Sequence, residues 1–231
     1  MHSLARRFVP GDNTPVYQGF VNWIGVCESD HALVEEMAVR DTWGRGERFG
    51  VVPVTRNKVY WAGGVAQADM HTDRRVPLKD EGLSIFQTWP DPIPAVIENT
   101  PESSINKIFV HDHDPIDTWH RDNVLLLGDA AHAPLPTSGQ GACQAMEDAW
   151  HLARCLRTHP ESHAAAFQAF TALRLKKTAG ITYAARDFAA SLFNRDAEFC
   201  RQRNARSKAT DYSAAVDGMA RGWGEGLPMG A

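Results

Sequence analysis

The sequence of 231 residues lacks the cysteine patterns that mark metal sites and redox motifs. Four cysteines are present, and no two of them form a C-x-x-C pair: Cys27, Cys143, Cys155 and Cys200. Zinc binding and thioredoxin-type chemistry therefore have no support in the sequence. Scattered cysteines without a pairing pattern are typical of a reducing compartment, which predicts a cytoplasmic location.

The sequence also lacks long apolar runs and an excess of positive charge. No apolar stretch approaches the roughly 20 residues that a membrane-spanning helix needs, and segment 1–7 is too short and too polar to predict a signal peptide. A net charge of −4 argues against nucleic acid or an anionic membrane as a partner. The nearest approach to a basic patch is interrupted by polar residues and predicts a solvated helix face: Arg201, Arg203, Arg206 and Lys208. Whether the chain forms a homodimer stays open.

The first half of the sequence has the pattern of an antiparallel sheet. A hydrophobic share of 43% is enough for a sizeable core. Four stretches rich in β-branched and aromatic residues predict strands: 16–27, 48–54, 58–64 and 105–111. The short polar turn at 55–57 predicts a hairpin between two of them. Segments 78–88 and 92–99 predict short helices, the second introduced by Pro92 and Pro94.

The pattern changes at Asn123. Segment 124–127 is a short continuous apolar run, which predicts a strand buried on both faces. A loop rich in proline, threonine, serine and glycine follows, and a helix is predicted from about Gln140 to Arg157. Apolar residues recur along one face of that helix at i, i+3 and i+4: Ala142, Ala145, Met146, Ala149, Ala153 and Leu156. A long helical pattern over 162–193 comes next, and the tail 222–231 is expected to be loose.

Segment 127–149 carries the chemical signal. A buried strand would deliver the Asp129 carboxylate to the carboxyl edge of a sheet, where open α/β sheets bind ligands. Gly128 has no side chain, so a ligand can approach the backbone, and Asp129 can accept hydrogen bonds from a polyol. Gly139 and Gly141 expose backbone N–H groups at the start of a helix, whose positive dipole end suits an anion.

This order of residues resembles the second flavin motif of the group A flavoprotein monooxygenases, the para-hydroxybenzoate hydroxylase-like family. That motif reads G-D-A-A-H, a proline-containing loop, G-Q-G and then A-x-E-D-A, and it is matched here by 128–132, Pro134 and Pro136, 139–141 and 145–149. The resemblance implies FAD as the cofactor. It places the Asp129 carboxylate on the ribityl hydroxyls and Pro136 beside the reactive edge of the flavin. The implied cofactor-binding residues are Gly128, Asp129, Ala131, Pro136, Gly139, Gln140, Gly141 and Ala142.

The resemblance extends to nearly the whole chain. Segment 48–50 with Pro53 and the pair Tyr60-Trp61 is similar to the substrate-domain hairpin of the family. It implies that Arg48 binds an anionic substrate and that Tyr60 stacks on it or forms a hydrogen bond with it. A surface position for Arg48 is an equal alternative. The implied reaction is NAD(P)H- and O₂-dependent hydroxylation of an aromatic or heteroaromatic substrate through a flavin C4a-hydroperoxide. No protein nucleophile is needed, and the sequence offers none.

The implied fold is α/β, or α+β for the chain as it stands. It consists of the C-terminal part of an FAD/NAD(P)-binding Rossmann-like domain, an antiparallel substrate-binding sheet and C-terminal helices. The expected parts are a remnant of the FAD-binding domain (1–13), the sheet domain (14–111), the return segment of the FAD-binding domain (112–158) and the helices (159–231). The sequence has no G-x-G-x-x-G turn, and Met1-His2-Ser3 resembles the end of the family's G-A-D-G-x-H-S segment. We therefore expect a fragment that holds FAD weakly.

Several alternatives remain open. The chain could be a non-catalytic remnant that binds a small aromatic molecule or a partner protein, or part of a flavin epoxidase. His111 and His113 could face the same way, but a third ligand is lacking, so no metal site is expected. His132 could be a general base, but no neighbour in the sequence orients it, which favours a structural role in the loop. Ser138 lies outside any G-x-S-x-G elbow, so a hydrolase is not expected.

Overall fold

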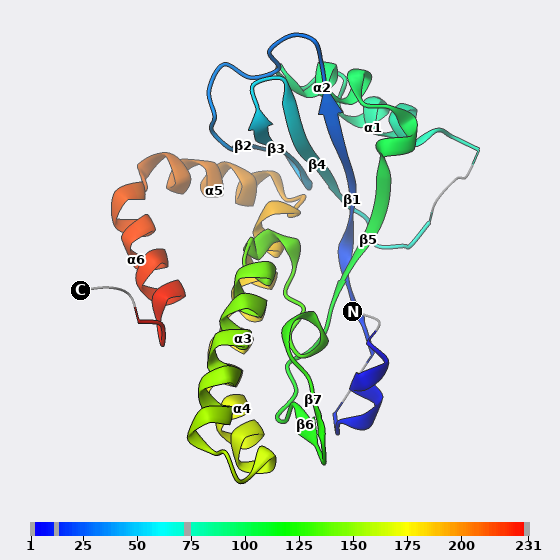
Figure 1. The fold of residues 1–231 in the computed structure, drawn as a ribbon. Coiled ribbons are helices and arrows are strands. Elements are labelled where there is room, and N and C mark those ends of the chain that lie inside the picture. The colour runs from blue at the N-terminus through cyan, green and yellow to red at the C-terminus, as the bar shows by residue number, and fades with distance from the viewer. Residues whose placement is uncertain (1–2, 12–13, 72–74, 229–231) are drawn as a thin grey trace. The chain divides into compact units, whose positions relative to one another are not determined.

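The computed structural model describes residues 3–11, 14–71 and 75–228. It divides into two compact units, each described by itself (Figure 1). The helical unit comprises Met1–Thr14, His113–Ala185 and Asp196–Ala231, and the sheet unit comprises Pro15–Asp112 and Arg186–Arg195. The mixture of helices and antiparallel strands confirms the predicted fold class.

The sheet unit is built on five antiparallel strands in the order β2-β3-β4-β1-β5. Their bounds are Val16–Glu28 (β1), Arg40–Trp43 (β2), Glu47–Thr55 (β3), Lys58–Ala66 (β4) and Asn106–Asp112 (β5). Four of the five confirm the strands predicted from sequence, and β3 and β4 form the predicted hairpin. Strand β2 was missed because its sequence Arg-Asp-Thr-Trp is polar and half exposed.

One face of this sheet is covered by helices α1 (Leu78–Phe86) and α2 (Ile93–Asn99), as Figure 1 shows. Both helices were predicted. Trp61 is fully buried beneath them, its ring stacks on Phe49 with centroids 5.4 Å apart, and its Nε1–H donates to the Thr100 hydroxyl at 2.9 Å. This side of the sheet is therefore a large aromatic core in which the indole N–H of Trp61 has a hydrogen-bond partner.

The opposite face of the sheet carries polar side chains among small residues. Side chains alternate along a strand, so Arg48 and Tyr60 point away from α1 and α2. Residues 186–195 belong to the same unit and contact this face: Phe193 stacks on Phe20 with centroids 4.1 Å apart. The Arg186 guanidinium donates two hydrogen bonds, of 2.7 and 2.8 Å, to the fully buried Asp112 carboxylate.

The helical unit contains the four longest helices, which are α3 (Gly141–Thr158), α4 (His163–Leu192, whose last turns fall in the sheet unit), α5 (Ala197–Ala209) and α6 (Tyr212–Gly224). Its short elements are η1 (Leu4–Phe8), β6 (His120–Arg121), β7 (Val124–Leu125), η3 (Gly128–Ala130) and η4 (Pro136–Ser138). Trp119 and Phe170 meet edge to face in its core, with centroids 5.8 Å apart. None of the described helices is long and apolar enough to cross a membrane.

One prediction for this unit was wrong, and one sequence pattern does not mark the buried face. Strand β7 is only two residues long, and both residues are half-buried, so it is not the fully buried strand that was predicted. Helix α3 has the predicted bounds, but Met146 is 66% exposed, and the stripe of small residues lies mostly in solvent. The polar residues of α3 are buried instead, because they form an ionic network described below.

Two smaller differences concern the C-terminal residues. Helix α6 continues to Gly224, so 222–224 are helical rather than loose, while 229–231 lie outside the described residues. The basic segment of α5 is solvated as predicted except at Arg203, which is 5% exposed.

Candidate functional site

The loop after β7 turns sharply onto helix α3 because Gly128 adopts a left-handed backbone, with φ of 55°. A Cβ atom at this position would lie 3.2 Å from the Cβ of Ala145, so glycine also permits the close approach to α3. Both constraints favour glycine over any other residue. The turn η3 then carries Asp129 with its side chain exposed.

The N-terminus of α3 lies beside this carboxylate. A Cβ placed on Gly141 would be 3.9 Å from Asp129 Oδ1, so the two predicted elements of the motif meet. Gly139 has φ of 62°, and a Cβ there would touch nothing within 4 Å. The N-cap residue Gln140 makes no side-chain capping bond, which leaves the first-turn N–H groups of an 18-residue helix for another acceptor.

The predicted cofactor residues gather around this helix start. Asp129, Pro136, Gly139 and Ala142 are exposed, and Gly141 is half-buried. Gly128, Ala131 and Gln140 are buried, and their backbone groups stabilise the loop and the start of α3. The Ala131 N–H donates to Gly128 O at 2.8 Å, and the Gln144 N–H donates to Gln140 O at 2.9 Å. The exposed members present a carboxylate, a proline ring and open backbone, which fits a polyol attached to a planar ring.

Arg6 supports the same loop from the start of the chain. It is 2% exposed, and its Nη1 donates to the carbonyls of Ala130 at 2.9 Å and Ala131 at 3.1 Å. The role of Arg6 is not evident from the sequence alone. Met1 and His2, which form part of the resemblance at the start of the chain, lie outside the described residues.

A buried carboxylate on α3 fixes the loop from the other side. Asp148 Oδ2 accepts hydrogen bonds from the Gly128 N–H and from His132 Nε2, both at 2.7 Å, and Oδ1 accepts one from Arg174 Nε at 2.7 Å. Burial alone would raise the pKa of Asp148, but the hydrogen bonds from His132, Gly128 and Arg174 outweigh it and lower the pKa below its ordinary value. Asp148 is therefore an ionised anchor for the loop.

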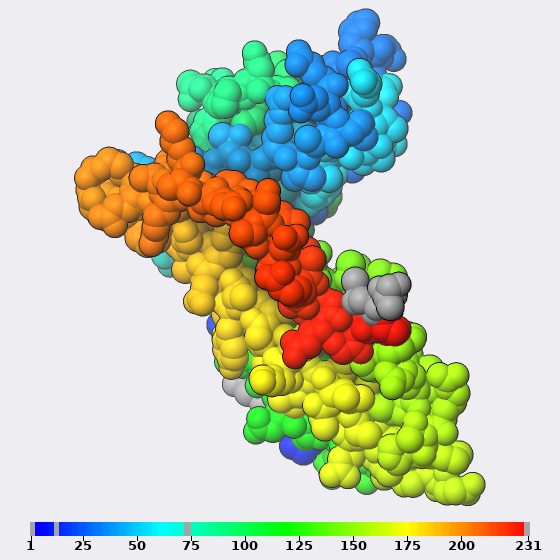
Figure 2. Space-filling view, turned by 90° about the vertical axis from the view of Figure 1, so that its left-hand side faces the viewer, coloured from blue at the N-terminus to red at the C-terminus, as the bar shows by residue number. Residues whose placement is uncertain are grey.

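Arg174 on α4 extends this anchor into a network. It is 1% exposed and also contacts the Glu147 carboxylate, while its Nη2 donates to Gln144 Oε1 at 2.7 Å. Lys177 Nζ donates to Glu147 at 2.9 Å and to the carbonyls of Trp223 and Glu225 at 2.6 and 2.8 Å. Figure 2 shows the end of α6, in red, lying against the yellow α4.

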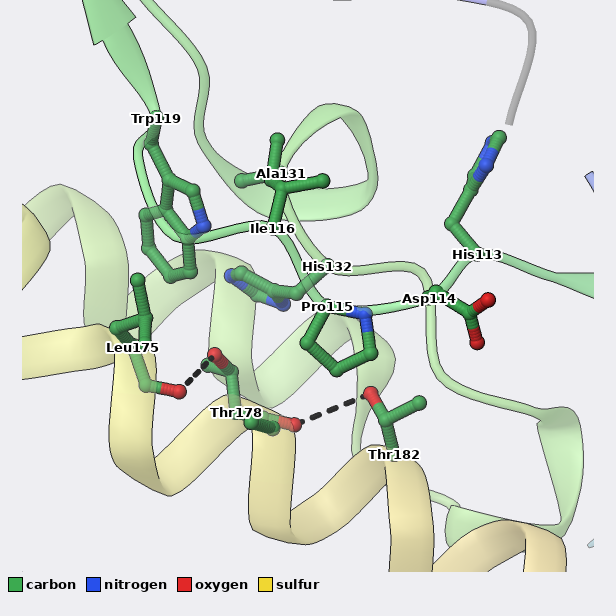
Figure 3. A pocket seen from close by; sticks show the side chains of 11 residues that line it. His113, Asp114, Pro115, Ile116, Trp119, Ala131, His132, Leu175, Thr178 and Thr182 are labelled. Atoms are coloured by element: carbon green, nitrogen blue, oxygen red, sulfur yellow. Dashed lines mark hydrogen bonds between the residues drawn. The ribbon is translucent and has the colours of Figure 1, made fainter. Parts of the chain in front are cut away.

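The expectation that no neighbour orients His132 was wrong. Asp148 orients it, and the imidazole is 7% exposed, lying near Trp119 and Pro115 in Figure 3. A cavity of about 10 Å³ adjoins it, close to the volume that a single water needs. Its Nδ1 is buried without a hydrogen-bond partner in the described chain. These contacts favour the structural role over that of a general base.

Arg48 and Tyr60 come together within the sheet unit. The Arg48 guanidinium lies over Gly50, where a Cβ would be 2.6 Å from Nη2, and Nε donates to Asp41 Oδ1 at 2.9 Å. Burial raises the pKa of Tyr60, and the nearby Arg48 cation partly offsets this. The pair forms a polar patch on the sheet face away from α1 and α2.

The segment 111–114 has a packing role. Asp112 also accepts a hydrogen bond from Gln18 Nε2 at 2.8 Å, in addition to the two from Arg186. The His111 Nδ1–H donates to the Phe109 carbonyl at 2.7 Å. Among the residues that the structure describes, no three His, Cys, Asp or Glu side chains are arranged to hold a metal.

We expect the fold to lose stability in mild acid, because His151 is buried beside the ionic network around Arg174. Burial lowers the pKa of His151, and the Arg174 cation lowers it further. Below about pH 6.5 the unfolded chain binds a proton that the folded chain resists, so the free energy of unfolding should fall as pH drops from about 7 to 5. His151→Leu should reduce this slope, measured by urea unfolding at each pH, whereas His31→Gln at an exposed site should not. Equal slopes in the wild type and His151→Leu would contradict the assignment.

Comparison with known proteins supplies the relatives of the chain. Residues 2–168 match a family described as FAD binding domain. The chain is 40% identical over 172 residues to aurachin C monooxygenase/isomerase of Stigmatella aurantiaca, covering 71% of this chain and 43% of that protein. It is 34% identical over 191 residues to the FAD-dependent urate hydroxylase of Klebsiella pneumoniae subsp. pneumoniae, covering 80% of this chain and 48% of that protein. The chain thus spans about half the length of the curated relatives it matches.

A solved structure agrees with these relatives. The crystal structure of Klebsiella pneumoniae HpxO complexed with FAD and uric acid superposes with a TM-score of 0.84 at 26% identity. The match covers 95% of this chain and 56% of that one. The family resemblance deduced from 128–149 is therefore confirmed.

Proposed function

Because the chain belongs to the FAD-binding domain family, we propose that it is the part of an FAD-dependent monooxygenase that holds the flavin end of the cofactor and the aromatic substrate. The observation that carries the proposal is the meeting of the Asp129 carboxylate with Gly141 at the uncapped start of α3. FAD supplies the redox chemistry when bound, with NAD(P)H as the electron donor and O₂ as the oxygen source. The expected parts 1–13 and 112–158 form the cofactor side.

In this proposal each exposed residue of the loop has one task. Asp129 accepts hydrogen bonds from the ribityl hydroxyls, and Pro136 lies along the edge of the ring. The N–H groups of 139–142 face the pyrimidine carbonyl, where the helix dipole stabilises negative charge. The buried network of Asp148, His132 and Arg174 holds these groups in place, so that they need not reorganise during the reaction.

The substrate belongs on the sheet face away from α1 and α2, within the expected part 14–111. Arg48 presents a guanidinium whose Nε is already paired with Asp41, which leaves Nη1 and Nη2 to bind an anionic oxygen of the substrate. Tyr60 is 38% exposed beside it, so its ring and hydroxyl can contact a planar ligand. Relatives named for urate and aurachin C support an electron-rich heteroaromatic ring as the substrate class. The helices of 159–231 support the loop.

The same proposal includes a cytoplasmic location. None of the four cysteines, all of which the structure describes, forms a disulfide, and Cys27, Cys155 and Cys200 are buried, as expected in a reducing compartment. A homodimer also belongs to the proposal, and light scattering on the purified chain would establish the oligomeric state.

An FAD titration of the chain tests the cofactor site. Asp129→Ala should weaken FAD binding by about one to two orders of magnitude, because it removes a charge-assisted hydrogen bond worth about 1.5–3 kcal/mol. Asp217→Ala, which removes an equally exposed carboxylate from α6, should leave the affinity unchanged. Riboflavin should compete with FAD, and ADP should not, since the described contacts lie at the flavin end. Equal FAD affinity for wild type and Asp129→Ala, with both folded, would refute the site.

A further inference from the structure

The sheet face away from α1 and α2 holds a buried amide whose oxygen accepts no hydrogen bond in the described chain. Asn22 on β1 is 6% exposed, and its Oδ1 is buried with no hydrogen-bond partner in the described chain. A buried acceptor without a donor destabilises a folded protein, so such atoms are rare without a functional reason. Nothing in the sequence alone distinguishes Asn22 from other strand residues.

This oxygen points over a position that has no side chain. In the sheet register Asn22 pairs with Gly64, and Gly64 pairs with Arg48, so the three residues form one row on one face. A Cβ on Gly64 would lie 2.4 Å from Asn22 Oδ1. Gly64, Ala62 and Gly50 give this part of the face a floor of small residues, with the oxygen directed onto it.

The spacing suits a single ring. Arg48 Nη2 lies over Gly50 and Asn22 Oδ1 lies over Gly64, one strand across and two residues along. With strands about 4.8 Å apart and a rise of about 3.3 Å per residue, these points are about 8 Å apart. Hydrogen bonds of about 2.9 Å from a ring N–H and from an exocyclic oxygen two ring positions away diverge around one heterocycle and together span about this distance.

A protein ring now fills this place. Phe193 Cζ and Cε1 lie 2.8 and 2.9 Å from the point where a Gly64 Cβ would be, and the ring stacks on Phe20. A phenyl edge offers no N–H to Oδ1. A flat ligand that took the place of Phe193 would keep the stacking surface of Phe20 and add the missing donor.

We propose that Asn22 is a further substrate-binding residue, whose Oδ1 accepts a hydrogen bond from a ring N–H of a planar heterocycle lying over Gly64. Arg48 binds the anionic oxygen of the same ring, and Phe193 occupies the place until the ligand arrives. This inference rests on the proposed function and narrows its substrate class. It selects N–H heterocycles such as urate over carbocyclic acids such as salicylate, which lack the N–H.

The test is Asn22→Leu, which keeps the branched outline of the side chain and removes the amide. It should raise the Tm by about 2–4 °C, because the orphaned acceptor is gone. It should weaken urate binding about tenfold in calorimetric titration of the chain and leave salicylate binding unchanged. Thr171→Val is the matched control, because Thr171 Oγ1 is also buried without a partner, but in the helical unit. That variant should raise the Tm and change neither affinity.

Other results for Asn22→Leu would contradict the assignment of Asn22. A lower Tm for Asn22→Leu would show that the amide stabilises the fold and is not an orphaned group, and an unchanged urate affinity would show that the ligand does not reach it. Equal losses of affinity for urate and salicylate would indicate a general packing effect. Each of these three results overturns the assignment of Asn22 and leaves the proposed function intact. If the wild type binds neither compound, the proposed substrate site fails, and the assignment of Asn22 fails with it.

Discussion

Replacing Arg174 with methionine should lower the free energy of unfolding by about 3–5 kcal/mol. The substitution keeps an apolar chain in place but leaves the Asp148 and Glu147 carboxylates buried without their guanidinium partner. Lys177 still reaches Glu147, but among the described side chains only His132 still contacts Asp148. Breaking one side of a buried ion pair costs far more than the pair contributes net, because the remaining charge stays desolvated.

Urea unfolding of the chain measures this effect. Arg201→Met is the matched control, since Arg201 pairs with Glu198 at side-chain exposures of 73% and 51%. That variant should change the free energy of unfolding by less than about 1 kcal/mol. A similarly small change for Arg174→Met would show that the network contributes little to the fold.

Arg186→Met should cost the sheet unit about 2–4 kcal/mol, somewhat less than Arg174→Met because Arg186 is 21% exposed. Asp112 is fully buried, and the variant leaves it only the hydrogen bond from Gln18 among the side-chain contacts described here. The lost pair also joins residues 186–195 to β5, so the Phe193 ring should loosen as well. Lys58→Met, at an exposed pair with Glu28, should have little effect.

The same urea unfolding experiment checks this prediction, with the near-ultraviolet signal of the aromatic residues as a second readout. A loss of stability no larger than that of Lys58→Met would mean that water reaches Asp112 and solvates it. The Arg174 and Arg186 effects should add, because their pairs share no residue.

Elements with a strong local pattern were predicted well from the sequence. Strands β1, β3, β4 and β5 have alternating or continuous apolar residues, and α3 and α4 have long helical periods. The order of residues in 128–149 was specific enough to indicate the family before any geometry was known, and the family match confirms it. The roles assigned to Asp129, Arg48 and Tyr60 stay predictions.

What the sequence could not reveal depends on contacts between distant residues. The small-residue stripe of α3 does not mark its buried face, because Asp148 turns toward Arg174, which lies 26 residues later. The acidic pair 147–148 together with Arg174 and Lys177 at i, i+3 is the signal that could have revealed the network. Asn22 has no sequence signal at all, since its meaning comes from the cross-strand register with Gly64.

The polarity that concealed β2 from sequence analysis has a use of its own. This strand is at one edge of the sheet, is four residues long, and exposes Arg40 and Asp41 to solvent. An edge strand carries backbone groups that can template the addition of a strand from another molecule, and short, charged edges are poor templates. Strand β2 therefore protects the sheet against edge-to-edge aggregation, which an apolar strand in the same place would invite.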